Sequence, residues 1–140
     1  MGGEYNVDIS GLTNITSSST AEADMNGKSN TAIIVAAHID TGLTSSDSAA
    51  MYCYSYTTDG TKSSDWYLPA AGELYSYVRG NYSAINTAMT TIGWAFSSTY
   101  FWSSSEYYNQ RAWAVYSASE STYLNDKQTK YSVVCFLAIS

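Results

Sequence analysis

The sequence has little of what catalytic sites usually require: one histidine, one proline, two cysteines and six basic residues among 140. The lone histidine, His38, has no second His or Cys at metal-ligand spacing, and we interpret it as a core or half-buried imidazole. Neither a phosphate-cradling glycine loop nor a nucleophile-elbow pattern occurs. These absences disfavour an enzyme, and we expect no metal and no cofactor.

Basic residues are scarce, and this limits the possible partners. The net charge is -6, and most of it lies before residue 98: residues 1–97 hold nine acidic and three basic residues, whereas residues 98–140 hold three of each. Nucleic acids require a basic footprint, and an acidic body opposes attachment to anionic membranes. No apolar run approaches the roughly 18 residues of a membrane span. We therefore expect no nucleic-acid partner and no membrane insertion.

Aromatic residues are abundant, at 15% of the chain with 14 tyrosines. The length and the 45% apolar content predict a single globular domain over residues 1–140. Residues 98–140 combine tyrosine with serine and asparagine, a mixture that is typical of recognition surfaces. The same mixture also lines the solvated sheet faces of secreted β-domains, so composition alone leaves both interpretations open.

Residues 98–140 contain two kinds of position. The apolar run 133–139 predicts a central strand that is covered on both faces. Further core positions are predicted at Phe101, Trp102, Trp113 and Val115. Positions without an apolar period, Ser117 among them, are predicted to be exposed. From these we select as candidate ligand-binding residues Tyr107, Tyr108, Asn109, Arg111, Tyr116, Ser119, Tyr123, Asn125 and Asp126.

Before residue 98 the patterns are mostly helical. An alternation over residues 5–9 predicts a first strand, which we expect to pair with the terminal one. Helices are expected over residues 31–39, 48–56, 69–79 and 83–91, although the β-branched content of the first leaves a strand open. In the third, the residues expected to form the buried face are Leu74, Tyr77 and Val78, and Gly80 is expected to end the helix. In the fourth, the residues expected to point inward are Ala84, Ile85, Ala88 and Met89. The order of a strand, helices and then strands predicts an α+β fold with a mostly antiparallel sheet.

Four short motifs occur in a fixed order along the second half of the chain: SDWYLP at 64–69 followed by EL at 73–74, FWSSSE at 101–106, AW at 112–113 and YSVVC at 131–135. This order resembles the C-type-lectin-like domains that include the C-terminal domain of a bacterial collagen-like adhesin. One branch of that family comprises the variable proteins of diversity-generating retroelements, whose C-terminal segment is rewritten at adenines by error-prone reverse transcription. The resemblance covers residues 60–140, with a weaker match over 11–14.

The resemblance implies a C-type lectin-like fold, with two or more helices packed on a mostly antiparallel sheet and termini close together. It implies a non-enzymatic module that displays a diversified segment, residues 98–140, to a protein or other cell-surface ligand. The module would face outward from a bacterial cell or a phage particle, in an oligomeric state that stays open. The alternatives are an adhesin domain of fixed specificity for a glycan or extracellular matrix, and an enzyme of the formylglycine-generating type, which needs reactive cysteines or a metal site.

Some residues depart from the family pattern or have roles implied only by it. Val134 and Phe136 stand where the family often has arginines. The tripeptides with which sugar-binding C-type lectins hold calcium do not occur, so calcium-dependent sugar binding is not implied. The family often has cysteines at the positions of Cys53 and Cys135, which favours a disulfide; two separate buried thiols are the alternative.

The motif contexts also suggest structural roles. We expect Trp66 and Trp102 to pack between helix and sheet rather than to stack on sugars. Asp65 and Glu106 are expected to anchor loops by accepting hydrogen bonds from backbone N–H groups.

Overall fold

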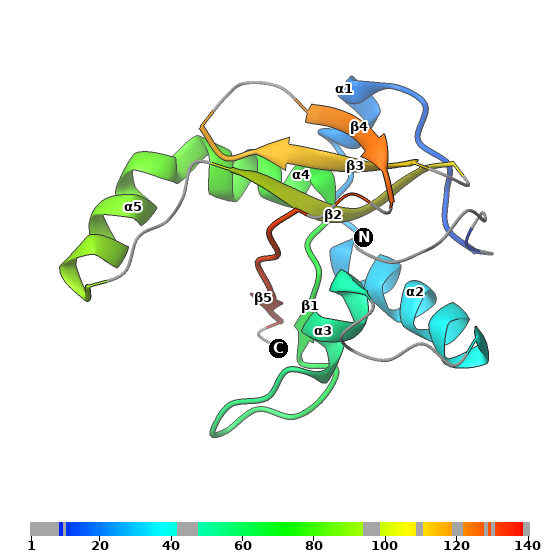
Figure 1. The fold of residues 1–140 in the computed structure, drawn as a ribbon, viewed down its shortest axis with the longest axis horizontal. Helices are drawn as coiled ribbons and strands as arrows, with labels where there is room; N and C mark the ends of the chain where they lie inside the picture. The colour runs from blue at the N-terminus through cyan, green and yellow to red at the C-terminus, as the bar shows by residue number, and fades with distance from the viewer. Residues whose placement is uncertain are drawn as a thin grey trace.

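The structure of the chain is a computed structural model, which describes residues 9, 11–41, 48–93, 99–108, 111–118, 122–127, 129 and 131–138. The elements before the main sheet are α1 (Ser18–Ala21), α2 (Gly27–Thr41), α3 (Ala49–Ser55), β1 (Trp66–Tyr67), α4 (Ala71–Glu73) and α5 (Tyr82–Thr91). They are followed by β2 (Tyr100–Tyr108), β3 (Arg111–Tyr116), β4 (Thr122–Asp126) and β5 (Phe136–Leu137). Helices followed by antiparallel strands confirm the predicted α+β class (Figure 1).

The central feature is an antiparallel sheet in the order β2-β3-β4, and its strands β2 and β3 bury side chains on both faces. On one face, which α2 and α3 cover, Trp102 lies opposite Ala114 and packs with Ile34 and Leu68. The small alanine side chains of β3 leave room there for the indole ring. On the other face, Phe101, Trp113 and Val115 pack against residues of α1 and α4. The four core positions predicted in β2 and β3 are confirmed.

The C-terminal run is not the central strand that its apolar composition predicts. β5 pairs only with β1, in a separate two-stranded sheet, with Trp66 opposite Leu137. Val133 to Phe136 are half-buried, and Leu137 is 40% exposed. The expected partner strand, residues 5–9, falls outside the described residues except for Ile9, as does Ile139. Ile9 is buried in a core cluster against which Val133 and Cys135 also pack, so described residues from near the two ends of the chain share one part of the core.

Cys53 and Cys135 form a disulfide across a sequence separation of 82 residues. Of the two alternatives, the structure therefore contains the bridge rather than two separate thiols. It ties α3 to the segment that leads into β5.

The predicted helix over residues 69–79 is replaced by a more irregular structure. α4 continues into a π-helical turn over Leu74–Val78 and a 3-10 turn over Arg79–Asn81, and α5 follows, so Gly80 does not end the helical path. Leu74 and Val78 are buried as predicted. Tyr77, expected in the same buried face, is 52% exposed and lies beside Phe136. A π turn carries more residues than an α turn, which changes the helix face that each following residue occupies.

The fourth predicted helix forms as α5, but its expected burial is wrong. None of its residues is buried, and it extends away from the rest of the described fold (Figure 1). The other two helix predictions are correct in place: α2 covers 31–39 but starts at Gly27, and α3 begins after Ser48, whose hydroxyl accepts a hydrogen bond from Met51 N. Within the described ranges no helix is long and apolar enough to cross a membrane.

Candidate binding surface

A wholly buried ion pair supports the end of the sheet. The carboxylate of Glu106, in the last part of β2, accepts a hydrogen bond from Lys127 Nζ in the turn after β4. Both side chains have no solvent exposure. Glu106 also accepts from the backbone N of Ile9 at 3.1 Å, so its predicted role as a backbone anchor is confirmed. Lysine is seldom fully buried, and the charge of Lys127 is compensated by this contact.

Glu73 joins three segments at the start of α4. Its Oε1 accepts hydrogen bonds from Gly27 N at 2.8 Å and Ala70 N at 3.1 Å, and its Oε2 accepts from the Tyr67 hydroxyl at 2.6 Å. The pKa of the Tyr67 hydroxyl is raised above its usual value, mainly because the group is partly buried and also because it donates a hydrogen bond to Glu73. A side chain at position 27 would collide with Oε1, so this close approach requires glycine. The polar residues of this motif therefore serve the framework.

Four tyrosine rings lie together at one end of the sheet, and we call them the tyrosine face: Tyr100, Tyr116, Tyr123 and Tyr131. The Tyr100 ring is at the centre, with ring centroids 4.8 Å from Tyr116, 5.2 Å from Tyr123 and 5.0 Å from Tyr131. Tyr123 is 36% exposed and the other three are half-buried. The pKa of the Tyr100 hydroxyl is raised above its usual value. The largest cause is partial burial, and the neighbouring hydroxyls of Tyr123, Tyr131 and Tyr116 contribute less.

The tyrosine face rests on ordered contacts with the core. The ring of Tyr131 lies 4.8 Å from that of buried Trp102, and its hydroxyl accepts a hydrogen bond from Asn125 Nδ2. Trp102 Nε1 donates to Thr129 O at 2.9 Å, and Thr129 Oγ1 donates to Asn125 Oδ1 at 3.1 Å. Trp102 therefore packs inside the fold, as expected. These contacts hold the base of the tyrosine face, so Tyr123 and its neighbours project from a fixed support.

The other end of the sheet carries a different group of polar residues. Tyr108 is 50% exposed, and Tyr107 is half-buried with its ring 6.1 Å from that of Trp113. Arg111 and Asp126 face each other across β3 and β4, with Arg111 Nε 3.7 Å from Asp126 Oδ1. Their side chains are 56% and 66% exposed.

The predicted binding residues therefore do not form one continuous surface. Tyr116, Tyr123 and Asn125 belong to the tyrosine face or to its support, whereas Arg111 and Asp126 point to the opposite face of the sheet. This follows from the strand period, because neighbouring residues alternate between faces. Tyr107 and Tyr108 lie at the far end of the hairpin. Asn109 and Ser119 lie outside the described residues.

One exposed-position prediction in the same segment is wrong, and two members of the tyrosine face were missed. Ser117 is wholly buried: its N donates to Thr99 O at 2.9 Å and its hydroxyl accepts from Thr99 N at 3.1 Å. Tyr100 and Tyr131 were not among the candidate residues. Tyr100 directly precedes the FWSSSE motif, and Tyr131 begins the YSVVC motif. Because both motifs indicate core packing, nothing in the sequence indicated that these two tyrosines are partly exposed.

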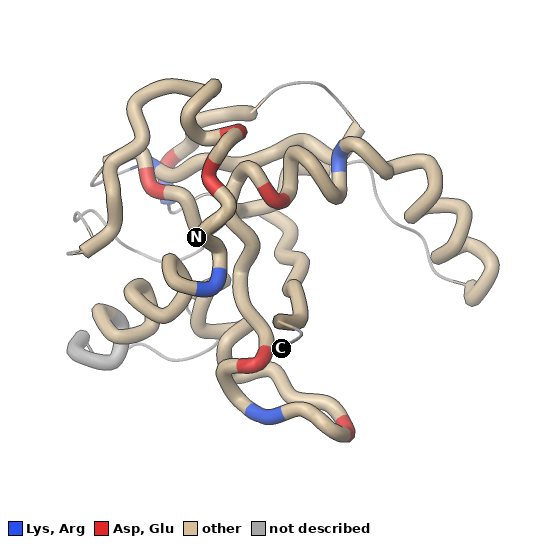
Figure 2. The backbone as a smooth tube through the Cα atoms, turned by 180° about the vertical axis from the view of Figure 1, so that it is seen from behind, with Lys and Arg blue, Asp and Glu red and all other residues tan. Residues whose placement is uncertain are grey.

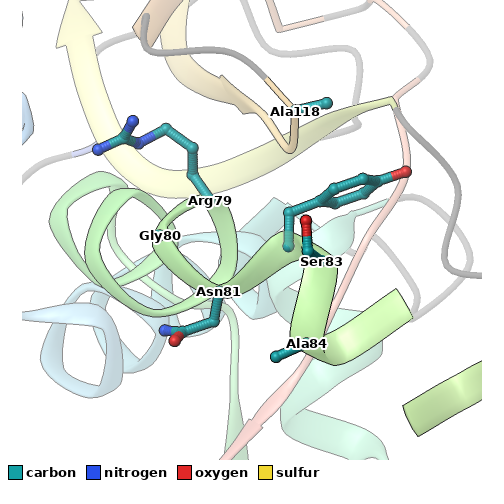
Figure 3. A pocket seen from close by; sticks show the side chains of 7 residues that line it. Arg79, Gly80, Asn81, Ser83, Ala84 and Ala118 are labelled. Atoms are coloured by element: carbon teal, nitrogen blue, oxygen red, sulfur yellow. The ribbon is translucent and has the colours of Figure 1, made fainter. Parts of the chain in front are cut away.

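A cavity of about 450 Å³ adjoins the turn after β3. It lies between the start of α5 and Ala118, and its lining includes Tyr82 and Ser83 (Figure 3). Arg79 also borders it, but its guanidinium lies over the Tyr75 ring, 4.1 Å from the centroid, and its Nε donates to Tyr75 O. The cavity thus offers hydroxyl groups rather than a set of paired acids and bases.

A second cavity, of about 280 Å³, lies beside Asp24 and Glu106. The Asp24 carboxylate accepts hydrogen bonds from Asn26, from Asn30 and from Ser105 Oγ at 2.6 Å. Among the described residues, no three His, Cys, Asp or Glu side chains are grouped so that they could hold a metal ion. The backbone of His38 lies in α2, and its side chain is outside the described part. These carboxylates therefore act as structural hydrogen-bond acceptors.

These features define an α+β domain of the C-type lectin-like type: a two-faced core, a bridged C-terminal segment and a strand end that carries clustered tyrosines. The model of the family described as "Lcl C-terminal domain" matches residues 13–136. The chain belongs to this family. A search of the curated proteins finds no match to the chain, and neither does a search of the solved structures.

Proposed function

We propose that this chain is a non-enzymatic ligand-binding module that recognises a protein or other cell-surface ligand through the tyrosine face. The tyrosine face is the observation that carries this proposal. Tyrosine rings offer large, stiff contact areas with a polar tip, and they dominate the binding energy of many interfaces. The packing of the core does not require four tyrosines at a partly exposed end of the sheet. Their grouping therefore favours a role in recognising a ligand.

The framework supports the same proposal. Buried Glu106–Lys127, the Glu73 contacts and the disulfide hold the strands independently of the exposed rings. Substitutions at exposed positions usually change stability by about 0.5 kcal/mol or less, so specificity could change while the fold persists. We therefore propose that residues 98–140 form the diversified segment of a retroelement variable protein, and that Tyr116 and Tyr123 are among its variable positions.

An outward-facing location and a non-enzymatic role complete the proposal. Disulfides persist mainly in oxidising compartments, which favours exposure on a bacterial cell or phage particle. Both cysteines are engaged in the bridge, so neither supplies the reactive thiol of a formylglycine-generating type of enzyme. The two carboxylates beside the second cavity have structural partners, and this also favours binding over catalysis.

The test compares three labelled proteins on bacterial cell surfaces and on a glycan array. They are the wild type, a Tyr116→Ala/Tyr123→Ala variant and a Tyr52→Ala control. Tyr52 is an exposed tyrosine, at 50%, and it lies on α3 rather than on the tyrosine face. We expect the control to bind as the wild type does, and the double variant to lose at least about tenfold in affinity, since removal of two anchors costs more than about 1.4 kcal/mol.

The outcomes separate the candidate functions. Binding to cells that is lost only in the double variant supports recognition through the tyrosine face. Binding confined to defined glycans supports instead an adhesin of fixed specificity. Equal binding by all three proteins contradicts a role for the tyrosine face.

A further inference from the structure

The buried Glu106–Lys127 contact joins the two outer strands of the main sheet. Glu106 lies in β2, and Lys127 directly follows β4. Ala112, on the middle strand, lies opposite both Glu106 and Asn125, which is two residues before Lys127. The small side chain of Ala112 leaves the lysine stem a path across β3 to the carboxylate. The strand register therefore brings an amine and a carboxyl group into direct contact.

This contact places a nucleophile beside an acyl group in a site without solvent. Both side chains are fully buried. Two buried charges are costly, and passing the lysine proton to the carboxylate leaves a neutral amine beside a neutral carboxylic acid. A desolvated lysine amine is a nucleophile. The exposed Arg111–Asp126 pair lacks both properties, because it is solvated and a guanidinium is not a nucleophile.

The surroundings of Glu106 suit an addition to its carboxyl carbon. The N–H of Ile9 donates to Oε1 at 3.1 Å and to Oε2 at 3.4 Å. A fixed N–H at this place can stabilise the negative charge that forms on oxygen when a nucleophile adds to the carbon. Glu106 also lines the cavity of about 280 Å³ that reaches exposed Thr13 and Asn26, which gives a released water molecule a way out.

The contact is also specific to its position. Figure 2 shows that the basic residues of the described chain are few and scattered, so Lys127 is not one member of a larger basic patch. Groups held in reacting orientation within one molecule reach effective concentrations of about 10⁵–10⁸ M. A single buried pair is therefore enough to react without a partner molecule.

We propose that Glu106 and Lys127 condense into an intramolecular amide, which cross-links β2 to the turn after β4. The lone pair of Lys127 Nζ forms a bond to Glu106 Cδ, and the bond from Cδ to one carboxyl oxygen breaks. The departing hydroxyl takes a proton from Nζ and leaves as water. One amine and one carboxylic acid thus give one amide and one water molecule, with no change of oxidation state.

The amide closes a ring around the candidate binding residues. Its two ends are 21 residues apart, and all nine candidates lie between them, from Tyr107 to Asp126. The bond therefore fixes both ends of this segment, whichever residues stand inside it. A cross-link also stabilises a fold by constraining the unfolded chain. This role as a clasp for the displayed segment rests on the proposed function, whereas the bond itself does not.

The mass of the reduced and unfolded full chain tests the proposal. We expect the wild type to be lighter than its sequence by one water molecule. Lys127→Met should have the full mass of its own sequence, because it has no amine at this position. The matched control is Lys62→Met, which removes an exposed lysine and should still lack one water molecule.

Cleavage at arginine locates the bond. An arginine-specific protease cuts this chain after Arg79 and Arg111. The reduced wild type should give residues 1–79 and a branched product in which residues 80–111 are joined to residues 112–140. Three separate linear products, a wild type with its full sequence mass, or a loss of water at any other residue would overturn the proposal.

The outcomes do not depend on the folding of a variant or on the ligand. The wild type alone decides whether the bond forms, so a Lys127 variant that fails to fold leaves the result intact. A cross-linked chain whose tyrosine face binds nothing would contradict the proposed function and leave the bond established. Ligand binding by a chain without the bond would do the reverse.

Discussion

The Glu106–Lys127 and Arg111–Asp126 pairs both lie within residues 98–140, and their surroundings are opposite. The first pair has no solvent exposure and is also bonded to the backbone of Ile9, whereas the side chains of the second pair are more than half exposed. Removal of one partner from a buried pair leaves an uncompensated charge, whereas an exposed pair contributes little. The comparison shows that framework and display positions alternate within a segment whose composition suggests display alone.

The largest expected effect comes from breaking the buried pair. Lys127→Met should lower the free energy of unfolding by about 3–5 kcal/mol, because the Glu106 carboxylate would stay buried without its partner. Arg111→Met, the matched change in the exposed pair, should cost no more than about 1 kcal/mol. Urea denaturation of both variants measures the difference. Equal losses would mean that the two pairs do not differ as described.

The disulfide is the second part of the framework that can be removed. Replacing both Cys53 and Cys135 with Ala should lower the free energy of unfolding by about 2–4 kcal/mol, since the bridge closes a long loop in the unfolded chain. Wild type unfolded in the presence of a reductant provides the control and should behave like the variant. If reductant left the wild-type transition unchanged, the bridge would not contribute to stability.

Smaller effects distinguish the ring at the base of the tyrosine face from rings that are more exposed. Tyr131→Ala should cost about 1–2 kcal/mol, because the ring packs on Trp102 and the hydroxyl bonds to Asn125. Tyr108→Ala and Tyr123→Ala should change the free energy of unfolding by about 0.5 kcal/mol or less and leave the melting temperature nearly unchanged. Thermal unfolding of the three variants measures this. A large loss at Tyr108 would place that side chain in the core.

The smallest effect concerns alkaline pH. The folded-state pKa of Tyr67 is raised above the unfolded value of about 10, so folding favours its protonated form. The stability that this contributes is fully present below pH 10 and is lost as the pH rises above 10. Tyr67→Phe should therefore lose less stability than the wild type over that range. Denaturation at several alkaline pH values tests this, and parallel curves for the two proteins would refute the assignment to Tyr67.

Some features could be predicted from the sequence because they depend on local patterns. The alternating large and small residues around Trp102 and Trp113 identify strands with buried faces, and Ser48 identifies the start of α3. The apolar stripe of α5 was also recognised, but an amphipathic pattern does not show whether the rest of the chain packs against that face. In the structure none of the α5 residues is buried.

Other features depend on contacts between distant residues. Lys127 has the sequence context of an exposed turn, and its burial follows only from meeting Glu106, 21 residues earlier. The run 133–137 is apolar enough for a central strand, yet it pairs with β1 at the side of the fold. The division of the candidate binding residues between two faces follows from strand register, which the sequence did not specify.

The most direct test of the central claim is to sequence the 3′ end of the gene and its neighbourhood. The account predicts a near-copy of the region encoding residues 98–140 beside a reverse transcriptase gene, differing only where the copy holds adenines. The variable codons should fall on positions of the tyrosine face such as Tyr116 and Tyr123, and not on Trp102, Glu106 or Lys127. The absence of a near-copy, or variable codons at the buried pair, would contradict the claim that this segment is a diversified surface on a fixed framework.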